Sequence, residues 1–201
     1  MLILAFDTAM AACSVAVWRD GEVRAQTRRL MERGQAEHLV PMIAEAMTAA
    51  GVDANNLDRI AVTVGPGSFT GVRVALATAR GLALTRNLPV IGLTTGEVLA
   101  AEAAGRKSDV AGIVSLIDSK RGDVYVERFT PTGARIGDAA SIPGAETAAW
   151  LKAHATSGTL AIVGDGARAL PPDERCSVLT DVVYPSAAVL AACAAARAPG
   201  P

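Results

Sequence analysis

The chain has 201 residues, of which 51% are apolar, and its 19 basic and 20 acidic residues leave a formal net charge of −1. A globular chain of this length buries roughly 70% of its unfolded surface, which is enough for a stable core without disulfides or a metal. Together with the apolar content, this excludes fibrous, disordered and disulfide-scaffold proteins. The charge balance also argues against a protein that binds nucleic acid by charge alone, because such proteins carry a basic excess. Any contact with nucleic acid is therefore expected to be shared with a partner.

Cysteine usage and hydropathy predict a cytoplasmic protein. The three cysteines, Cys13, Cys176 and Cys193, include no C-x-x-C pair, which suits a reducing compartment. The first residues contain no basic leader, and no stretch of about 18 uncharged apolar residues could span a bilayer. We expect a protein without membrane association.

Three strands are expected first. The apolar run over residues 2–6 is typical of a strand that is buried on both faces, and Asp20-Gly21 is a hairpin signal between strands at 13–18 and 22–30. The elements expected next are a helix over about 35–50, a strand over 57–64, a helix over 72–86 and a strand over 89–93. Apolar residues at helical spacing mark the first of these helices: Leu39, Met42, Ile43, Ala46 and Met47.

The second half of the chain has weaker patterns. Thr94 and Glu97 form a capping box that begins a further helix. Beyond it we expect strands over 110–117, 124–129 and 160–163, and helices over 145–155 and 186–197. The alternation of strands and helices predicts an α/β fold, divided into an N-terminal lobe over residues 1–108 and a smaller C-terminal lobe over 109–201.

A glycine-rich segment between a strand and a helix is the strongest candidate for chemistry. It contains Gly65, Gly67, Ser68, Thr70 and Gly71. Glycines there allow backbone N–H groups to face an anion at the helix start, and the two hydroxyls could add donors. The segment matches neither the dinucleotide fingerprint nor the P-loop, so a tight turn with a helix cap is the competing interpretation.

Asp7 and Thr8, at the end of the first strand, form the second candidate. A carboxylate in that place could position a metal-bound phosphate or a water, or it could simply cap the turn into the hairpin. The charged segment 118–123 and the glycine-rich turn 164–166 are interpreted as turns rather than as sites.

The chain is poor in histidine. With only His38 and His154, and no carboxylate cluster at metal-ligand spacing, neither a histidine-based metal site nor a Ser/His/Asp triad is expected. The histidines therefore offer no catalytic and no metal-binding residue.

The helix over 72–84 is apolar or small on almost every face. Such a helix is usually buried all round, so its second cover could be another subunit or the helix over 35–50. The pattern alone does not separate these two alternatives.

Four segments together resemble one known family. They are Ile3-Leu-Ala-Phe-Asp-Thr8, Gly65-Pro-Gly-Ser-Phe-Thr-Gly-Val-Arg73 with the helix after it, Arg121-Gly-Asp-Val-Tyr-Val126, and Gly164-Asp-Gly166. These segments resemble the TsaB family, also called YeaZ, well over about the first 130 residues and loosely over the rest.

The resemblance implies an actin-like ATPase (ASKHA, ribonuclease H-like) fold with two lobes, the second reduced. It also implies a non-catalytic subunit in threonylcarbamoyladenosine modification of tRNA, where the group is attached to the adenosine next to the anticodon. The partners implied are a catalytic TsaD-like paralogue and a TsaE-like ATPase, with tRNA contacted only through the complex. TsaD-like catalysts carry a histidine pair where this chain has Gln35-Ala-Glu-His38, with one histidine.

By the same resemblance, the residues Asp7, Thr8, Gly65, Gly67, Ser68, Thr70 and Gly71 are remnants of nucleotide loops. The second lobe, from Ala111 on, is expected to be too short to close a full cleft, so no cofactor is expected to bind tightly and ATP or ADP only in the complex. The partner interface, also used for a homodimer in isolation, is expected on the two helices over 35–50 and 72–86. The residues predicted for it are His38, Pro41, Met42, Glu45, Arg73, Leu76, Arg80 and Leu84.

Two other functions are kept as alternatives. One is a stand-alone ATP-binding enzyme of the actin-like class, an ATPase or phosphotransferase. The other is a peptidase, which the missing metal ligands disfavour.

Overall fold

The computed structural model describes residues 1–104, 106, 109–155 and 158–198. Within it the chain forms two compact units. One consists of Met1–Val98 together with the segment from Pro185 on, and the other of Leu99–Tyr184.

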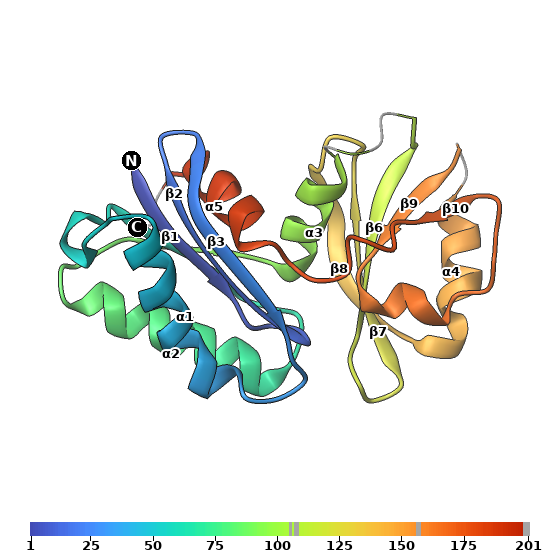
Figure 1. Cartoon of the computed structure of the whole chain (residues 1–201). Coiled ribbons are helices and arrows are strands. Elements are labelled where there is room, and N and C mark those ends of the chain that lie inside the picture. The colour runs from blue at the N-terminus through green and yellow to red at the C-terminus, as the bar shows by residue number, and fades with distance from the viewer. Residues whose placement is uncertain (105, 107–108, 156–157, 199–201) are drawn as a thin grey trace. The chain divides into compact units, whose positions relative to one another are not determined.

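The first unit is built on a mixed five-stranded sheet with the order β3-β2-β1-β4-β5 (Figure 1). Its strands are β1 Leu2–Asp7, β2 Ala12–Arg19, β3 Glu22–Leu30, β4 Arg59–Thr63 and β5 Val90–Leu93. The central strand β1 pairs antiparallel with β2 and parallel with β4. Every residue of β1 is buried, as its unbroken apolar run predicts.

Helices cover both faces of this sheet. The helices α1 (Gln35–Ala49) and α2 (Phe69–Leu84) lie on one face, and α5 (Ala187–Ala195) lies on the other (Figure 1). A short 3-10 helix, Ala54–Asn56, leads into β4. The helix α2 turns a row of small residues inward at every fourth position: Gly71, Ala75, Ala79 and Ala83.

The predicted capping box is confirmed at the start of α3 (Thr95–Ala104). The backbone N–H of Thr94 donates to Glu97 Oε2 at 2.6 Å, and the N–H of Glu97 donates to Thr94 Oγ1 at 3.0 Å. Two N–H groups that the helix itself cannot use are satisfied in this way.

The second unit repeats the strand order of the first. Its sheet runs β10-β9-β6-β7-β8, and β6 pairs antiparallel with β7 and parallel with β9. The strands are β6 Gly112–Asp118, β7 Asp123–Phe129, β8 Arg135–Pro143, β9 Leu160–Val163 and β10 Cys176–Val178. Its other elements are the part of α3 from Leu99 on, the helix α4 (Thr147–His154), and the 3-10 segments Gly144–Glu146 and Asp165–Ala169.

The two sheets confirm the predicted α/β fold with two related lobes. The second unit keeps all five strands, so its reduction lies in its helices. The units differ from the predicted lobes in one important respect: the C-terminal helix α5 packs on the sheet of the first unit, against Ile3 and Ala5, and not on the second. The predicted boundary at residue 108 lies outside the described residues.

The structure also decides how α2 is covered. Arg73, Ala77 and Arg80 are exposed, and Leu84 is 83% exposed, so burial of the whole helix beneath α1 is wrong. Within the described part of the chain, no helix combines the length and the apolar character needed to cross a bilayer.

The inward row of α2 generates a stability prediction. Ala79→Leu adds three carbon atoms to a fully buried position and should lower the free energy of unfolding by about 1–3 kcal/mol through overpacking. Ala77→Leu is the matched control, because Ala77 lies on the exposed face of the same helix and should change stability by less than about 0.5 kcal/mol. Urea unfolding followed by circular dichroism measures both. Equal effects of the two variants would contradict the assignment of the faces.

Candidate functional site

Strand register places a row of polar side chains across the end of the first sheet. Asp7 on β1 lies opposite Ser14 on β2, and Ser14 lies opposite Arg28 on β3. Side chains that are in register on neighbouring strands share a face, and here the face is the one that α5 covers. Thr63 extends the row on β4, where its hydroxyl reaches Asp7.

Asp7 is a buried carboxylate with uneven hydrogen bonding. Its Oδ1 accepts from Thr63 Oγ1 and from the backbone N–H of Ala9, the latter at 3.1 Å. Its Oδ2 has no partner in the part of the chain that is described. Burial raises the pKa of Asp7 to about 6, although the bonds from Thr63 and Ala9 and the charge of Arg28 act in the opposite direction.

The structure brings the two predicted candidates together. Thr8 Oγ1 donates to the carbonyl oxygen of Gly71 at 2.7 Å, and the N–H of Ser68 donates to the carbonyl oxygen of Ala9 at 2.6 Å. The residues after Asp7 therefore hold the first turn of α2. Thr70 is different, because its side chain is exposed.

Glycine is required at two places in this junction. A Cβ atom on Gly67 would overlap the carbonyl oxygen of Ala9, and one on Gly71 would overlap that of Thr8. Gly65 is buried and has a φ of 96°, a conformation that L-residues rarely adopt. The glycines predicted from the sequence thus serve the close approach of two backbone segments.

The helix N-terminus in this junction is already partly satisfied. Ser68 is the N-cap of α2, and its Oγ accepts from the N–H of Gly71 at 3.3 Å. With the Ser68 N–H bound to Ala9, two of the N–H groups that an anion would need are occupied by the protein itself. The competing interpretation of the segment, a capped tight turn, accounts for these contacts.

The predicted interface residues lie on α1 and α2, with one correction. His38, Pro41 and Glu45 of α1 are exposed, and Glu45 pairs with Arg29 at 3.2 Å. Met42 is fully buried in the core beneath α1 and is unavailable to a partner, so its assignment to the interface is wrong.

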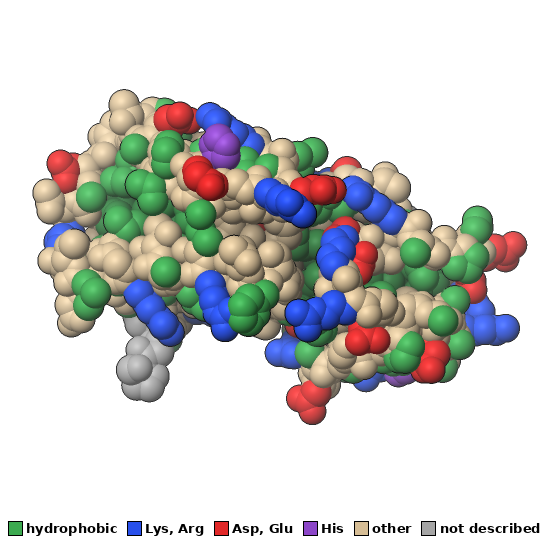
Figure 2. Space-filling model, turned by 90° about the horizontal axis from the view of Figure 1, so that it is seen from below, with side chains coloured by type: hydrophobic (Ala, Val, Ile, Leu, Met, Phe, Trp, Pro, Cys, Tyr) green, Lys and Arg blue, Asp and Glu red, His purple; other side chains and the backbone are tan. Residues whose placement is uncertain are grey.

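On α2, Arg73, Arg80 and Leu84 are exposed and Leu76 is half-buried. Two further exposed apolar side chains on these helices were not predicted from the sequence. Phe69 is 69% exposed and lies beneath the guanidinium of Arg73, 3.2 Å from its carbon to the ring centroid, and Val40 of α1 is 58% exposed. Figure 2 shows hydrophobic side chains gathered where α1 and α2 lie.

We call this area the α1–α2 surface. It consists of the exposed or half-buried residues His38, Val40, Pro41, Glu45, Phe69, Arg73, Leu76, Arg80 and Leu84. The glycine-rich sequence around Phe69 suggested a loop, whereas Phe69 begins the helix.

In the second unit, contacts connect the two segments that were predicted to be turns, residues 118–123 and 164–166. Lys120 Nζ lies 3.0 Å from Asp118 Oδ2 and 3.1 Å from Asp165 Oδ2, and the N–H of Asp118 donates to Asp165 Oδ1 at 3.0 Å. The bonds and charge of Lys120 lower the pKa of Asp118 against the effect of its partial burial. Lys120 therefore forms ion pairs with both carboxylates. Among the residues described, no three His, Cys, Asp or Glu side chains are grouped as a metal ion requires.

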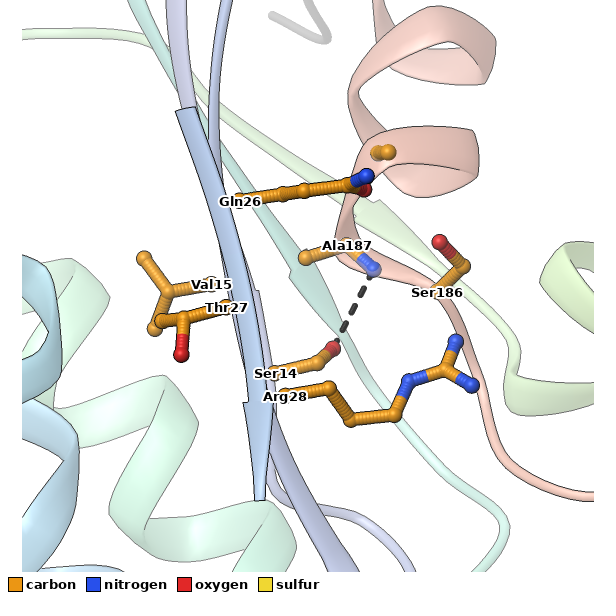
Figure 3. Close-up of a pocket in the computed structure, with 8 residues that line it drawn as sticks. Ser14, Val15, Gln26, Thr27, Arg28, Ser186 and Ala187 are labelled. Atoms are coloured by element: carbon orange, nitrogen blue, oxygen red, sulfur yellow. Dashed lines mark hydrogen bonds between the residues drawn. The ribbon is translucent and has the colours of Figure 1, made fainter. Parts of the chain in front are cut away.

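A cavity of about 380 Å³ lies between β2, β3 and the first turn of α5 (Figure 3). Gln26 and Arg28 point from β3 toward α5. Ser14 Oγ donates to the carbonyl oxygen of Pro185 and accepts from the N–H of Ala187, both at 3.1 Å. The sequence reasoning did not find this cavity, because the helix that closes it comes from the opposite end of the chain.

Comparison with known proteins gives consistent relatives. A family model described as TsaD, tRNA N6-adenosine threonylcarbamoyltransferase, matches residues 29–169. The chain is similar to the tRNA threonylcarbamoyladenosine biosynthesis protein TsaB of Escherichia coli K12, with 42% identity over 125 residues, 62% of this chain and 53% of the relative. It is also similar to TsaB of Bacillus subtilis 168, with 32% identity over 126 residues, 62% of this chain and 53% of the relative. The matched region thus spans about half the length of these curated relatives.

A solved structure matches over a longer stretch. YeaZ from Pseudomonas aeruginosa superimposes with a TM-score of 0.83 and 28% identity, and covers 100% of this chain and 94% of that one. The likeness extends through both units and confirms the predicted α/β fold.

The junction between the two backbone segments generates a prediction for Gly71. Gly71→Ala should lower the free energy of unfolding by about 2 kcal/mol or more, because its methyl group would overlap the carbonyl oxygen of Thr8. Gly81→Ala is the matched control in the same helix, where a Cβ atom meets nothing within 4 Å. It should raise stability by about 0.5–1 kcal/mol through helix propensity. Thermal unfolding distinguishes the two, and stabilisation by both would contradict the close approach.

Asp7 generates a prediction for pH dependence. With its pKa raised from 3.8 in the unfolded chain to about 6 in the fold, its stabilising contribution is complete below pH 3.8 and is lost as the pH rises through 6. The loss amounts to ~3 kcal/mol. Asp7→Asn stays uncharged, so the variant should gain stability relative to the native chain between pH 4.5 and 7. Urea unfolding at both pH values measures this difference, and a constant difference would contradict it.

Proposed function

The chain belongs to the TsaB/YeaZ family of TsaD-type proteins, and on that premise we propose that it is a non-catalytic partner subunit in tRNA modification. In this proposal it supports a catalytic TsaD-like paralogue. The complex transfers a threonylcarbamoyl group to the adenosine next to the anticodon.

The α1–α2 surface is the observation that carries the proposal. It presents Phe69 and Leu84, two large apolar side chains that are 69% and 83% exposed, beside the cations Arg73 and Arg80. Larger exposed apolar patches that polar groups surround mark protein interaction sites. Arginine and aromatic residues are also those that dominate binding energies at interfaces.

A second observation supports the proposal that this chain is not the catalytic subunit. Where TsaD-like catalysts carry a histidine pair, this chain has Gln35 and His38. Gln35 Nε2 donates to the carbonyl oxygens of Met31 at 3.1 Å and Met10 at 3.4 Å, so this side chain ties the start of α1 to the backbone. Such a role suits a residue that fixes the fold.

The remaining assignments follow from the same proposal. The isolated chain forms a homodimer through the α1–α2 surface, which the TsaD-like partner occupies in the working complex. The protein acts in the cytoplasm, with a TsaE-like ATPase as the third component and tRNA reached only through the complex. The N–H groups of Ser68 and Gly71 already donate hydrogen bonds within the chain. Binding of ATP or ADP is therefore expected only in the complex, where the partner would complete the site.

Reconstitution tests the proposal. Threonylcarbamoyl transfer to tRNA is measured with the TsaD-like and TsaE-like proteins, with and without this chain. We expect transfer to depend on the chain, and full transfer in its absence would overturn the proposal. Catalytic turnover by the chain alone would favour the competing functions: ATP hydrolysis would favour a stand-alone ATPase, and peptide cleavage would favour a peptidase.

Charge reversal tests the surface itself. Arg80→Glu should weaken binding of the TsaD-like partner about tenfold or more, because an interface arginine is replaced by an opposite charge. The control is Lys152→Glu, a charge reversal at an exposed position on α4 in the other unit, which should leave binding unchanged. Titration calorimetry gives both affinities. Unchanged binding by Arg80→Glu would remove Arg80 from the interface.

A further inference from the structure

The carboxylate of Asp7 lies at the start of a chain of hydrogen bonds that ends at α2. Oδ1 of Asp7 accepts from the N–H of Ala9, at 3.1 Å, and the carbonyl oxygen of Ala9 accepts from the N–H of Ser68, at 2.6 Å. Ser68 is the N-cap of α2 and binds the N–H of Gly71 through its Oγ. One side chain is thus connected to the first turn of the helix through two peptide groups.

A second contact runs beside the first. Thr8, between Asp7 and Ala9, donates from Oγ1 to the carbonyl oxygen of Gly71 at 2.7 Å. Thr8 is fully buried, so this bond is not exchanged with water. The turn after β1 therefore holds both the N-cap and the first turn of α2.

The two segments leave no space for independent movement. Neither Gly67 nor Gly71 could carry a Cβ atom without overlapping the carbonyl oxygens of Ala9 and Thr8. Close-packed contacts of this kind transmit a displacement instead of absorbing it. A change in the turn after Asp7 must therefore move the start of α2.

The same first turn carries the near end of the α1–α2 surface. Phe69 follows the N-cap directly, and its ring stacks against the guanidinium of Arg73 one turn later. The orientation of these two side chains depends on how the helix begins. The junction and the outward face of α2 are thus parts of one rigid arrangement.

We propose that Asp7 is a positioning residue for the partner protein: through Ala9 and Ser68 it fixes the start of α2 and so sets the geometry of the α1–α2 surface. The inference rests on the proposed function, since it takes that surface to be the docking site. It gives the turn after β1 a role in this chain that needs no bound nucleotide.

The position of Asp7 makes this control sensitive to its charge. Two charged or titratable groups interact with it electrostatically. Arg28 on β3 lowers the pKa of Asp7, and Asp7 in turn raises the pKa of Cys13 on β2. Thr63 on β4 contributes an uncharged hydroxyl, and Oδ2 has no partner among the described residues. Ionisation of the buried group near pH 6 changes the bond to Ala9, and with it the start of α2.

Hydrogen exchange in the full-length chain tests the positioning directly. Asp7→Ala removes the acceptor for Ala9, and we expect the amides of Ser68, Gly71 and Val72 to exchange about tenfold faster. Asp7→Asn keeps an acceptor oxygen and should restore the native protection factors of these amides. In this variant the protection factors should not change between pH 5 and 7. Thr8→Val, which removes the parallel bond to Gly71, should also speed exchange at these amides.

A matched control comes from the same polar row. Ser14 is buried like Asp7 and lies opposite it on β2, but its hydroxyl binds Pro185 and Ala187 at the start of α5. Ser14→Ala should therefore speed exchange in α5 and leave the amides at the start of α2 unchanged.

Binding of the TsaD-like partner is the second readout. Affinity should fall about tenfold for Asp7→Ala and for Thr8→Val, and remain native for Asp7→Asn at pH 5 and for Ser14→Ala. If Asp7→Ala does not fold, Thr8→Val and the pH profile of Asp7→Asn decide the question. The inference would be overturned if Thr8→Val showed native exchange and native affinity, and if amide protection in Asp7→Asn followed the same pH profile as in the native chain. If the native chain binds no partner, the proposed function fails, while hydrogen exchange still decides whether Asp7 positions α2.

Discussion

The start of α2 rests directly on the turn after β1, and the first unit is arranged around that contact. Only glycine at positions 67 and 71 allows the two backbones to meet, and the hydroxyl of Thr8 then bonds across the contact. Once the helix begins there, its inward positions fall on Ala75, Ala79 and Ala83, whose small side chains keep it close to the sheet. The large side chains of the core come from the sheet and from α1.

The second unit repeats the topology with different chemistry. Gly164, with a φ of 92°, follows β9 as Gly65 follows β4, and a Cβ atom on it would overlap the carbonyl oxygen of Leu116. The charges are treated in opposite ways. In the first unit a single buried carboxylate, Asp7, is left with a raised pKa. In the second, Lys120 pairs with two carboxylates, the partly exposed Asp118 and the buried Asp165.

Local patterns predicted the elements that bury a continuous or periodic apolar face. β1, α1 and the capping box of α3 are of this kind, because their signals lie within a few neighbouring residues. β8 was not predicted, since nearly all of its residues are exposed and show no alternation, and β10 has only three residues. Met42 shows how one residue can be misassigned: the spacing that predicts the helix also places it on the buried face. The bond from Thr63 to Asp7 could not be predicted, because the two residues lie 56 positions apart in the chain.

The division of α2 into two faces explains why a high apolar content does not all serve the core. The inward row consists of small residues, whose burial contributes little area per residue. Val74, Leu76 and Leu82 are partly buried against the core. Phe69 and Leu84, in contrast, lie on the outward side at the two ends of the helix, and Arg73 and Arg80 stand between them. A lone exposed leucine needs no explanation, but α2 exposes an aromatic ring stacked against an arginine, and the neighbouring helix α1 exposes Val40. The close helix start and the small inward row both bring α2 near the sheet, and Phe69 and Leu84 remain exposed for contacts outside the unit.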